Sequence, residues 1–236
     1  MFSIASGLSY LLSFFDLQFI QEQIMATYNL EEQEKIDSIK NWWDRYGTAI
    51  SIVLTAFLVS VGGTQLWKYY QQQQAKQAAD LYALLQQVRA SNEAIKINDA
   101  AQLIIEGYPS TGYAPRAAFI AAQAYIEAGN NKHAIQNLQW VIDHAKETAL
   151  HDVARLRVAG ILLDEDKYDD ALRTLSVPHG ETFAGLYSDR KGDILAASKK
   201  ISEARLSYQA AIDKLSKNNN YYNIVQMKLD ALGDSE

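Results

Sequence analysis

The sequence contains no cysteine, which excludes disulfides, zinc–thiolate sites, iron–sulfur clusters and thiol nucleophiles. Proline and glycine are also scarce, with 3 prolines and 12 glycines in 236 residues. So few turn-forming residues predict a mostly helical chain and argue against a β-sandwich or barrel. Basic residues do not dominate either, because 22 Lys and Arg stand against 28 Asp and Glu, a net charge of −6. This balance argues against nucleic acid as a partner.

Motifs that carry catalysis or bind cofactors are missing as well. The sequence has no Walker loop, no dinucleotide glycine fingerprint and no GxSxG nucleophile turn. His144 and His151 are seven residues apart, but no third histidine or carboxylate joins them at ligand spacing. The acidic run at 164–170 lacks the glycine and the final glutamate of a calcium-binding EF-hand loop. We therefore expect no enzyme activity, no cofactor and no metal; an enzyme of unrecognised type would show a pocket of titratable groups with shifted pKa values.

One long segment carries no charge. Residues 46–67, YGTAISIVLTAFLVSVGGTQLW, form an uncharged run of 22 residues. As a helix this run spans about 33 Å, close to the roughly 30 Å of a bilayer's hydrocarbon core. Tyr46 and Trp67 stand at its two ends, where amphipathic rings prefer the membrane interface. The run predicts a transmembrane helix, with the lipid bilayer as its partner.

The residues before this span fall into two parts. Residues 1–24 are apolar but contain no Lys or Arg, unlike a signal peptide, which has a basic start. We interpret them as an upstream extension, with the functional start at Met25. Residues 25–45 are expected to form a short amphipathic segment in the cytoplasm. Three Lys or Arg residues precede the span closely and two follow it, so the positive-inside rule favours, by this small margin, a cytoplasmic N-terminus.

The chain after the span is expected to form a helical repeat domain. Residues 68–90 contain neither Gly nor Pro and predict a helical stalk or first helix. In residues 91–236, small residues recur near the 34-residue period of tetratricopeptide repeats, where two antiparallel helices touch. The alanines of the second helices, Ala134, Ala171 and Ala204, are spaced by 37 and 33 residues. The predicted packing positions of the three units are Ala122, Tyr125, Ala134, Ala159, Ala171, Gly192, Ala204 and Tyr208.

Stacked helical hairpins of this kind bury a continuous core and leave a curved groove. The expected fold class is therefore all-α, with one transmembrane helix followed by a tetratricopeptide-like α-solenoid; an unrelated helical bundle is the alternative. An incomplete earlier unit is expected at 98–109. A C-terminal capping helix is expected within 221–236, with Ile224, Met227 and Leu232 facing inward.

Such a groove suits an extended or helical segment of another protein. The first helix of each unit lines it in the tetratricopeptide geometry, and the repeat register selects candidate groove residues on these helices. The alternative for each is packing against a neighbouring helix. The candidates are Arg116, Phe119, Gln123, Leu156, Asp189 and Asp193.

Three segments carry a resemblance to a known family. They are KIDSIKNWWDRYGTA at 35–49, LRVAGILLDEDKYDDALRTL at 156–175 and VQMKLDAL at 225–232. With the order of anchor, span and repeats, they make residues 28–232 similar to the bacterial YfgM-like family, the ancillary subunit of the Sec translocon. Residues 1–24 have no counterpart in this resemblance, which supports the start at Met25.

The resemblance implies a single-pass protein of the Gram-negative inner membrane, with its N-terminus in the cytoplasm and its repeat domain in the periplasm. It implies two partners, the SecYEG channel and a membrane-anchored periplasmic chaperone of the prolyl-isomerase type. The implied role is to pass emerging proteins to periplasmic chaperones, with a link to envelope stress signalling. It brings no catalytic residues. The residues by themselves support an anchored repeat scaffold, so a scaffold of another envelope assembly or of a stress-signalling complex stays the alternative.

Overall fold

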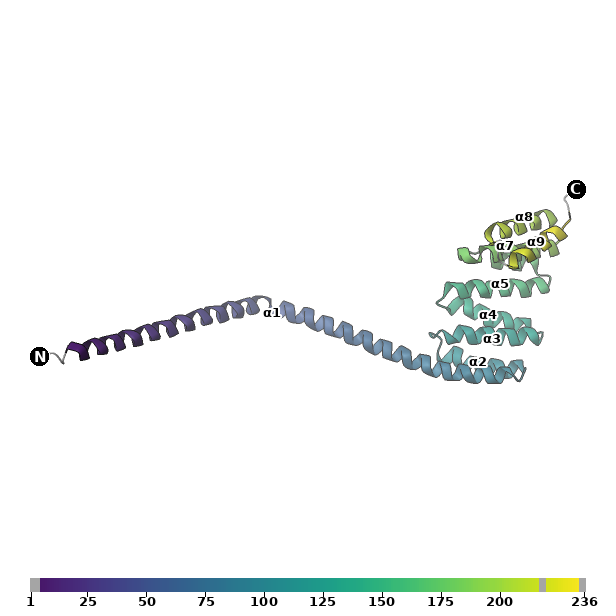
Figure 1. Cartoon of the computed structure of the whole chain (residues 1–236). Coiled ribbons are helices and arrows are strands. Elements are labelled where there is room, and N and C mark those ends of the chain that lie inside the picture. The colour runs from purple at the N-terminus through teal and green to yellow at the C-terminus, as the bar shows by residue number, and fades with distance from the viewer. Residues whose placement is uncertain (1–4, 217–219, 234–236) are drawn as a thin grey trace. The chain divides into compact units, whose positions relative to one another are not determined.

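The computed structural model describes the backbone of residues 5–216 and 220–233, and the side chains of residues 34–216 and 220–233. Every regular element in this described part is helical (Figure 1). The all-α prediction is therefore confirmed. The chain divides into two compact units, Met1–Lys68 and Tyr69–Glu236. The predicted extension 1–24 and the start at Met25 lie outside the residues whose side chains are described.

The first unit contains most of α1, a helix that begins at Ala5 and ends at Arg89. Between Glu34 and Arg89 it is long and apolar enough to cross a membrane, and its most apolar stretch has no buried side chain. The side chains of Ile52, Val53 and Phe57 are each more than 60% exposed, which is the pattern of a helix that faces lipid.

An aromatic cluster lies just before this apolar stretch. The Trp42 ring centre is 6.5 Å from that of Trp43 and 6.0 Å from that of Tyr46. The Trp43 ring folds back over Gly47, where a Cβ atom would lie 2.9 Å from it. Amphipathic rings grouped at one end of an apolar helix are typical of the membrane–water interface.

The second unit is a row of helical hairpins. It begins with the last part of α1 and continues with α2 (Ala94–Gly107), α3 (Tyr113–Glu127), α4 (Asn131–His144), α5 (Thr148–Asp164), α6 (Tyr168–Leu175), the short 3-10 helix η1 (Glu181–Phe183), α7 (Ala184–Ala197), α8 (Ile201–Lys214) and α9 (Asn220–Ala231). Each helix packs mainly on its neighbours in sequence, and α5 also contacts α7 (Figure 1). The hairpins therefore stack along the chain.

The helices approach closely because small residues lie where they cross. All eight residues predicted to pack the repeats are buried. Gly192 on α7 shows how tight one crossing is, because a Cβ atom added there would lie 2.5 Å from the Tyr208 ring on α8. Such contact leaves no room for one further methyl group without a shift of the ring or the backbone.

The turn inside each hairpin has the same backbone form. One residue of each turn has a left-handed φ between 55° and 71°: Asn92, Gly129, Asp166 and Lys199. The next N–H donates to a carbonyl five residues earlier in three of them, Asn130 to Tyr125, Lys167 to Leu162 and Lys200 to Leu195. These three are Schellman helix ends. The four left-handed residues are spaced by 37, 37 and 33 residues. The position of Asn92 makes the end of α1 and α2 the first hairpin.

The last helix, α9, differs from the prediction in its rotation. Val225 is fully buried, whereas Ile224 is 48% and Met227 71% exposed, so the inward orientation predicted for these two was wrong. Leu232, predicted to face inward, is partly buried against the core formed with α8. The inner face of α9 instead includes Lys228, a charged side chain that hydropathy assigns to the outside.

Candidate functional site

The first helices of three successive hairpins form one open groove. Helices α3, α5 and α7, with η1, border this groove, whose volume of about 490 Å³ is within the range of ligand sites. Its lining residues are Gln123, Ile126, Val153, Leu156, Arg157, Gly160, Ile161, Asp164, Phe183, Leu186 and Arg190. Two of the six predicted groove residues, Gln123 and Leu156, lie on its wall.

Phe119 reaches the groove indirectly. It lies one turn before Gln123 on α3 and is partly buried. The guanidinium carbon of Arg157 on α5 is 5.0 Å from the centre of the Phe119 ring, a distance at which a cation is attracted to the ring face. The ring therefore orients the Arg157 guanidinium at the groove wall.

Arg116 is not among the residues that line the groove. Its guanidinium donates to the Gly112 carbonyl and lies 3.8 Å from a Glu147 carboxylate oxygen, next to the connection between α4 and α5. Arg116 thus interacts with the ends of helices rather than with the cavity that holds Gln123 and Leu156.

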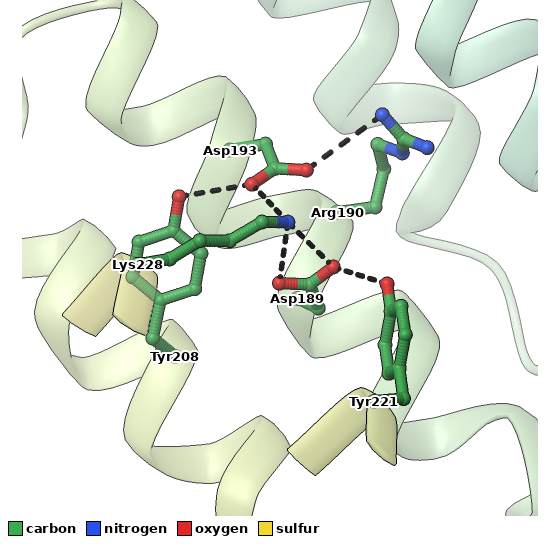
Figure 2. Close-up of polar contacts among 6 residues, drawn as sticks. All are labelled: Asp189, Arg190, Asp193, Tyr208, Tyr221 and Lys228. Carbon is green, nitrogen blue, oxygen red and sulfur yellow. Dashed lines mark hydrogen bonds and ion pairs between the residues drawn. The ribbon is translucent and has the colours of Figure 1, made fainter. Parts of the chain in front are cut away.

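Asp189 and Asp193 on α7 are covered by the C-terminal helix. Figure 2 shows Lys228 of α9 between them, with its Nζ 2.9 Å from both carboxylate oxygens of Asp189 and 2.8 Å from Asp193 Oδ1. The Tyr221 hydroxyl, also on α9, donates to Asp189 Oδ2 at 2.5 Å. Asp189 is only 1% exposed, so it is not on an open groove surface.

Two further residues complete this cluster. The Tyr208 hydroxyl of α8 donates to Asp193 Oδ1 at 2.9 Å, and an Arg190 guanidinium nitrogen lies 3.7 Å from Asp193 Oδ2 (Figure 2). Burial, and then the neighbouring carboxylates, raise the pKa of Tyr208 and that of Tyr221 well above the usual range. Both phenols therefore stay protonated and keep donating to the carboxylates.

A second buried carboxylate positions the groove wall. Asp152 of α5 is 2% exposed; its Oδ2 accepts the Gly180 N–H at 2.9 Å and its Oδ1 accepts the Tyr187 hydroxyl at 3.0 Å. Burial, and then the bond to Asp152, raise the pKa of Tyr187 to about 12. Asp152 thereby ties α5 to the segment before α7 and to α7 itself, and α5 and α7 are two of the three helices that line the groove.

The buried polar groups of the described part are satisfied within the fold. Every buried side-chain nitrogen and oxygen in the described part has a hydrogen-bond partner. Among residues 34–216 and 220–233, no three His, Asp or Glu side chains are grouped so as to hold a metal ion. The acidic run at 164–170 contains the turn between α5 and α6, in which the Tyr168 hydroxyl donates to Asp166.

Sequence reasoning missed Asp152, Arg157, Arg190 and Lys228. The register of α5 and α7 is a signal that could have found the two arginines, because each is adjacent in sequence to a residue chosen for the groove. No local pattern identifies Lys228, since its role depends on the return of α9 to α7.

Comparisons with known proteins agree with this architecture. The family model described as "Tetratricopeptide repeat-like domain" matches residues 40–234. A protein of Neisseria gonorrhoeae is 32% identical over 209 residues, which cover 86% of this chain and 98% of the relative. A protein of Haemophilus influenzae is 29% identical (78% and 90% of the two chains), and one of Escherichia coli is 22% identical (77% and 87%). All three carry the name "Ancillary SecYEG translocon subunit". No solved structure matches the chain.

Proposed function

We propose that this chain associates with the SecYEG channel as a membrane-anchored protein-binding scaffold. The chain belongs to the family of ancillary SecYEG translocon subunits, which have a tetratricopeptide repeat-like domain. The observation that carries the proposal is that this chain matches its relatives over nearly their whole length and that these relatives share one name. An apolar stretch of α1 without buried side chains and a repeat domain with an open groove supply the two parts that such a scaffold needs.

The first part is the anchor. Residues 46–67 cross the inner membrane in this proposal, and the cluster of Trp42, Trp43 and Tyr46 lies at its cytoplasmic side. The small excess of basic residues before the span supports a cytoplasmic N-terminus and a periplasmic repeat domain. This orientation places the groove on the side where translocated proteins emerge.

The second part is the repeat domain. We propose that it passes translocated proteins to periplasmic chaperones and that a membrane-anchored chaperone of the prolyl-isomerase type is a partner. The groove supports this role, because an apolar floor between helices with charged walls fits segments of other proteins. The proposed handover needs binding and release, and no catalytic group takes part in it.

Co-purification in a mild detergent tests the proposal. We would compare the full chain with a variant whose residues 46–67 are replaced by an unrelated single span. Recovery of channel subunits with the full chain is the expected result; their loss in the variant places the contact in the membrane, and their retention places it in the repeats. Recovery of a different envelope complex without channel subunits would refute the Sec assignment.

A further inference from the structure

We propose that the groove between α3, α5 and α7 binds a short protein segment that combines apolar side chains with carboxylates. This inference rests on the protein-binding role proposed for the repeat domain and specifies its ligand. It follows from three observations: the groove has an apolar floor, it has a cationic wall, and the acidic side chains of α7 next to it are covered by α9.

The floor takes apolar side chains. Leu156 and Val153 of α5, Ile126 of α3 and Leu186 of α7 face the same space, and all four are only partly buried. The volume of about 490 Å³ between these side chains is large enough for the apolar part of a short peptide segment.

The wall is cationic at its centre. Arg157 forms no ion pair with any residue whose side chain is described, and the Phe119 ring holds its guanidinium in place. The Arg190 guanidinium lies beside α5, 3.7 Å from the position of a Cβ atom added at Gly160. Asp164 is the one acidic residue that lines the described groove, and it lies seven residues, about 10 Å, beyond Arg157 on α5. A carboxylate on the ligand therefore finds the Arg157 guanidinium, and on the same groove that of Arg190, which lies 3.7 Å from Asp193 Oδ2.

The neighbouring part of α7 shows how this domain already holds a helix. There, α9 presents a cation to two carboxylates and a hydroxyl to one of them. That interaction uses the acidic side chains of α7 and leaves Arg190 facing the groove. The groove thus has the opposite charge preference to the acidic surface covered by α9. A segment that bears carboxylates complements it.

Three model peptides test the inference on the full chain in nanodiscs of uncharged lipid, with empty nanodiscs as the blank. Each peptide has three leucines, each followed by one variable residue, between Gly-Ser flanks, with an uncharged fluorophore. The variable residue is Glu, Gln or Lys, and affinity is measured by fluorescence anisotropy. Because the protein carries a net charge of −6, general electrostatic attraction favours the Lys peptide, whereas the groove favours the Glu peptide. The two explanations therefore predict opposite orders of affinity.

The Glu peptide is expected to bind about three- to fivefold more tightly than the Gln peptide, as for a good exposed ion pair, and the Lys peptide most weakly. Arg157→Gln is expected to reduce the Glu preference below about twofold and to leave the affinity for the Gln peptide unchanged. Arg173→Gln, an exposed arginine on α6, is the matched control and keeps the preference. Asp164→Asn is expected to increase it.

Equal binding of the Glu and Gln peptides, or tightest binding of the Lys peptide, overturns the inference. So does an equal loss of the preference in Arg157→Gln and Arg173→Gln. The same variants are tested for co-purification of channel subunits. A preference for the Glu peptide without recovered channel subunits would support the proposed ligand and refute the translocon role. Recovered channel subunits without this preference would support the translocon role and refute the proposed ligand.

Discussion

Replacing Lys228 by methionine is expected to destabilise the repeat domain by about 2–4 kcal/mol. The Lys228 Nζ lies within 2.9 Å of oxygens from both Asp189 and Asp193, and Asp189 is 1% exposed. Methionine keeps most of the side-chain packing but leaves a buried carboxylate without this cation. Breaking a buried pair in this way costs about 3–5 kcal/mol, and the 31% exposure of the Lys228 side chain lets water offset part of the cost.

Thermal unfolding of the full chain in detergent, followed by circular dichroism at 222 nm, measures the effect. For a domain of this size, 1 kcal/mol shifts the melting temperature by about 2–4 °C, so we expect a decrease of about 5–15 °C. Lys214→Met is the matched control. Lys214 lies 2.6 Å from a Glu181 oxygen, closer than Lys228 to its partners, but both side chains are exposed and no change is expected.

A double variant separates the charge from the packing. Asp189→Asn removes the negative charge, so adding it to Lys228→Met is expected to recover more than half of the lost stability. A loss below about 0.5 kcal/mol in Lys228→Met, or a double variant no more stable than Lys228→Met, would refute the role assigned to this ion pair.

Three other changes test the hairpin packing and the Asp152 contacts. Gly192→Ala is expected to cost about 1–3 kcal/mol in urea unfolding, because its Cβ would overlap the Tyr208 ring; Gly107→Ala, which meets no atom within 4 Å, is the control and should cost nothing. Asp152→Asn is expected to cost about 1–3 kcal/mol, because an amide replaces one carboxylate oxygen by a donor and leaves a buried N–H or O–H without an acceptor; a melting temperature equal to that of the unchanged protein would contradict this. The pKa of Tyr187 is raised from 10 to about 12, so its stabilisation is complete below pH 10 and decreases as the pH rises to 12. Tyr187→Phe should therefore make the loss of stability between pH 10 and 12 shallower by up to about 1.4 kcal/mol per pH unit, and an unchanged slope would contradict the shift.

The repeat architecture was predictable because its signal is local and apolar. Ala134, Ala171 and Ala204 recur near one period, and each small side chain is needed where two adjacent helices cross. The uncharged run 46–67 was equally readable as part of a helix long and apolar enough to cross a membrane, since that property depends on composition and length. The turns were less readable, because their left-handed residue is glycine only at position 129 and is Asn, Asp or Lys in the others.

The groove was only partly predictable, since its surface depends on contacts distant in sequence. The register placed Gln123 and Leu156 on first helices, where both line the groove, because it follows from helix periodicity alone. It also selected Asp189 and Asp193, which have the same periodicity but lie beneath α9. Nothing near them in the sequence indicates that Lys228, 39 residues after Asp189, returns to cover them.

The C-terminal helix therefore does more than close the end of the array. Lys228 neutralises the carboxylates of α7 from one side, while Arg190 contacts Asp193 from the side of the groove. If Lys228 is lost, Asp193 interacts more strongly with Arg190, and the α7 end of the groove becomes more negative. A cap that acted only by covering apolar surface would change stability without changing ligand preference. The ion pairs on the two sides of α7 link stability to the proposed ligand preference. Lys228→Met should therefore lower the preference for the Glu peptide as well as the melting temperature, even at temperatures where the domain is still folded.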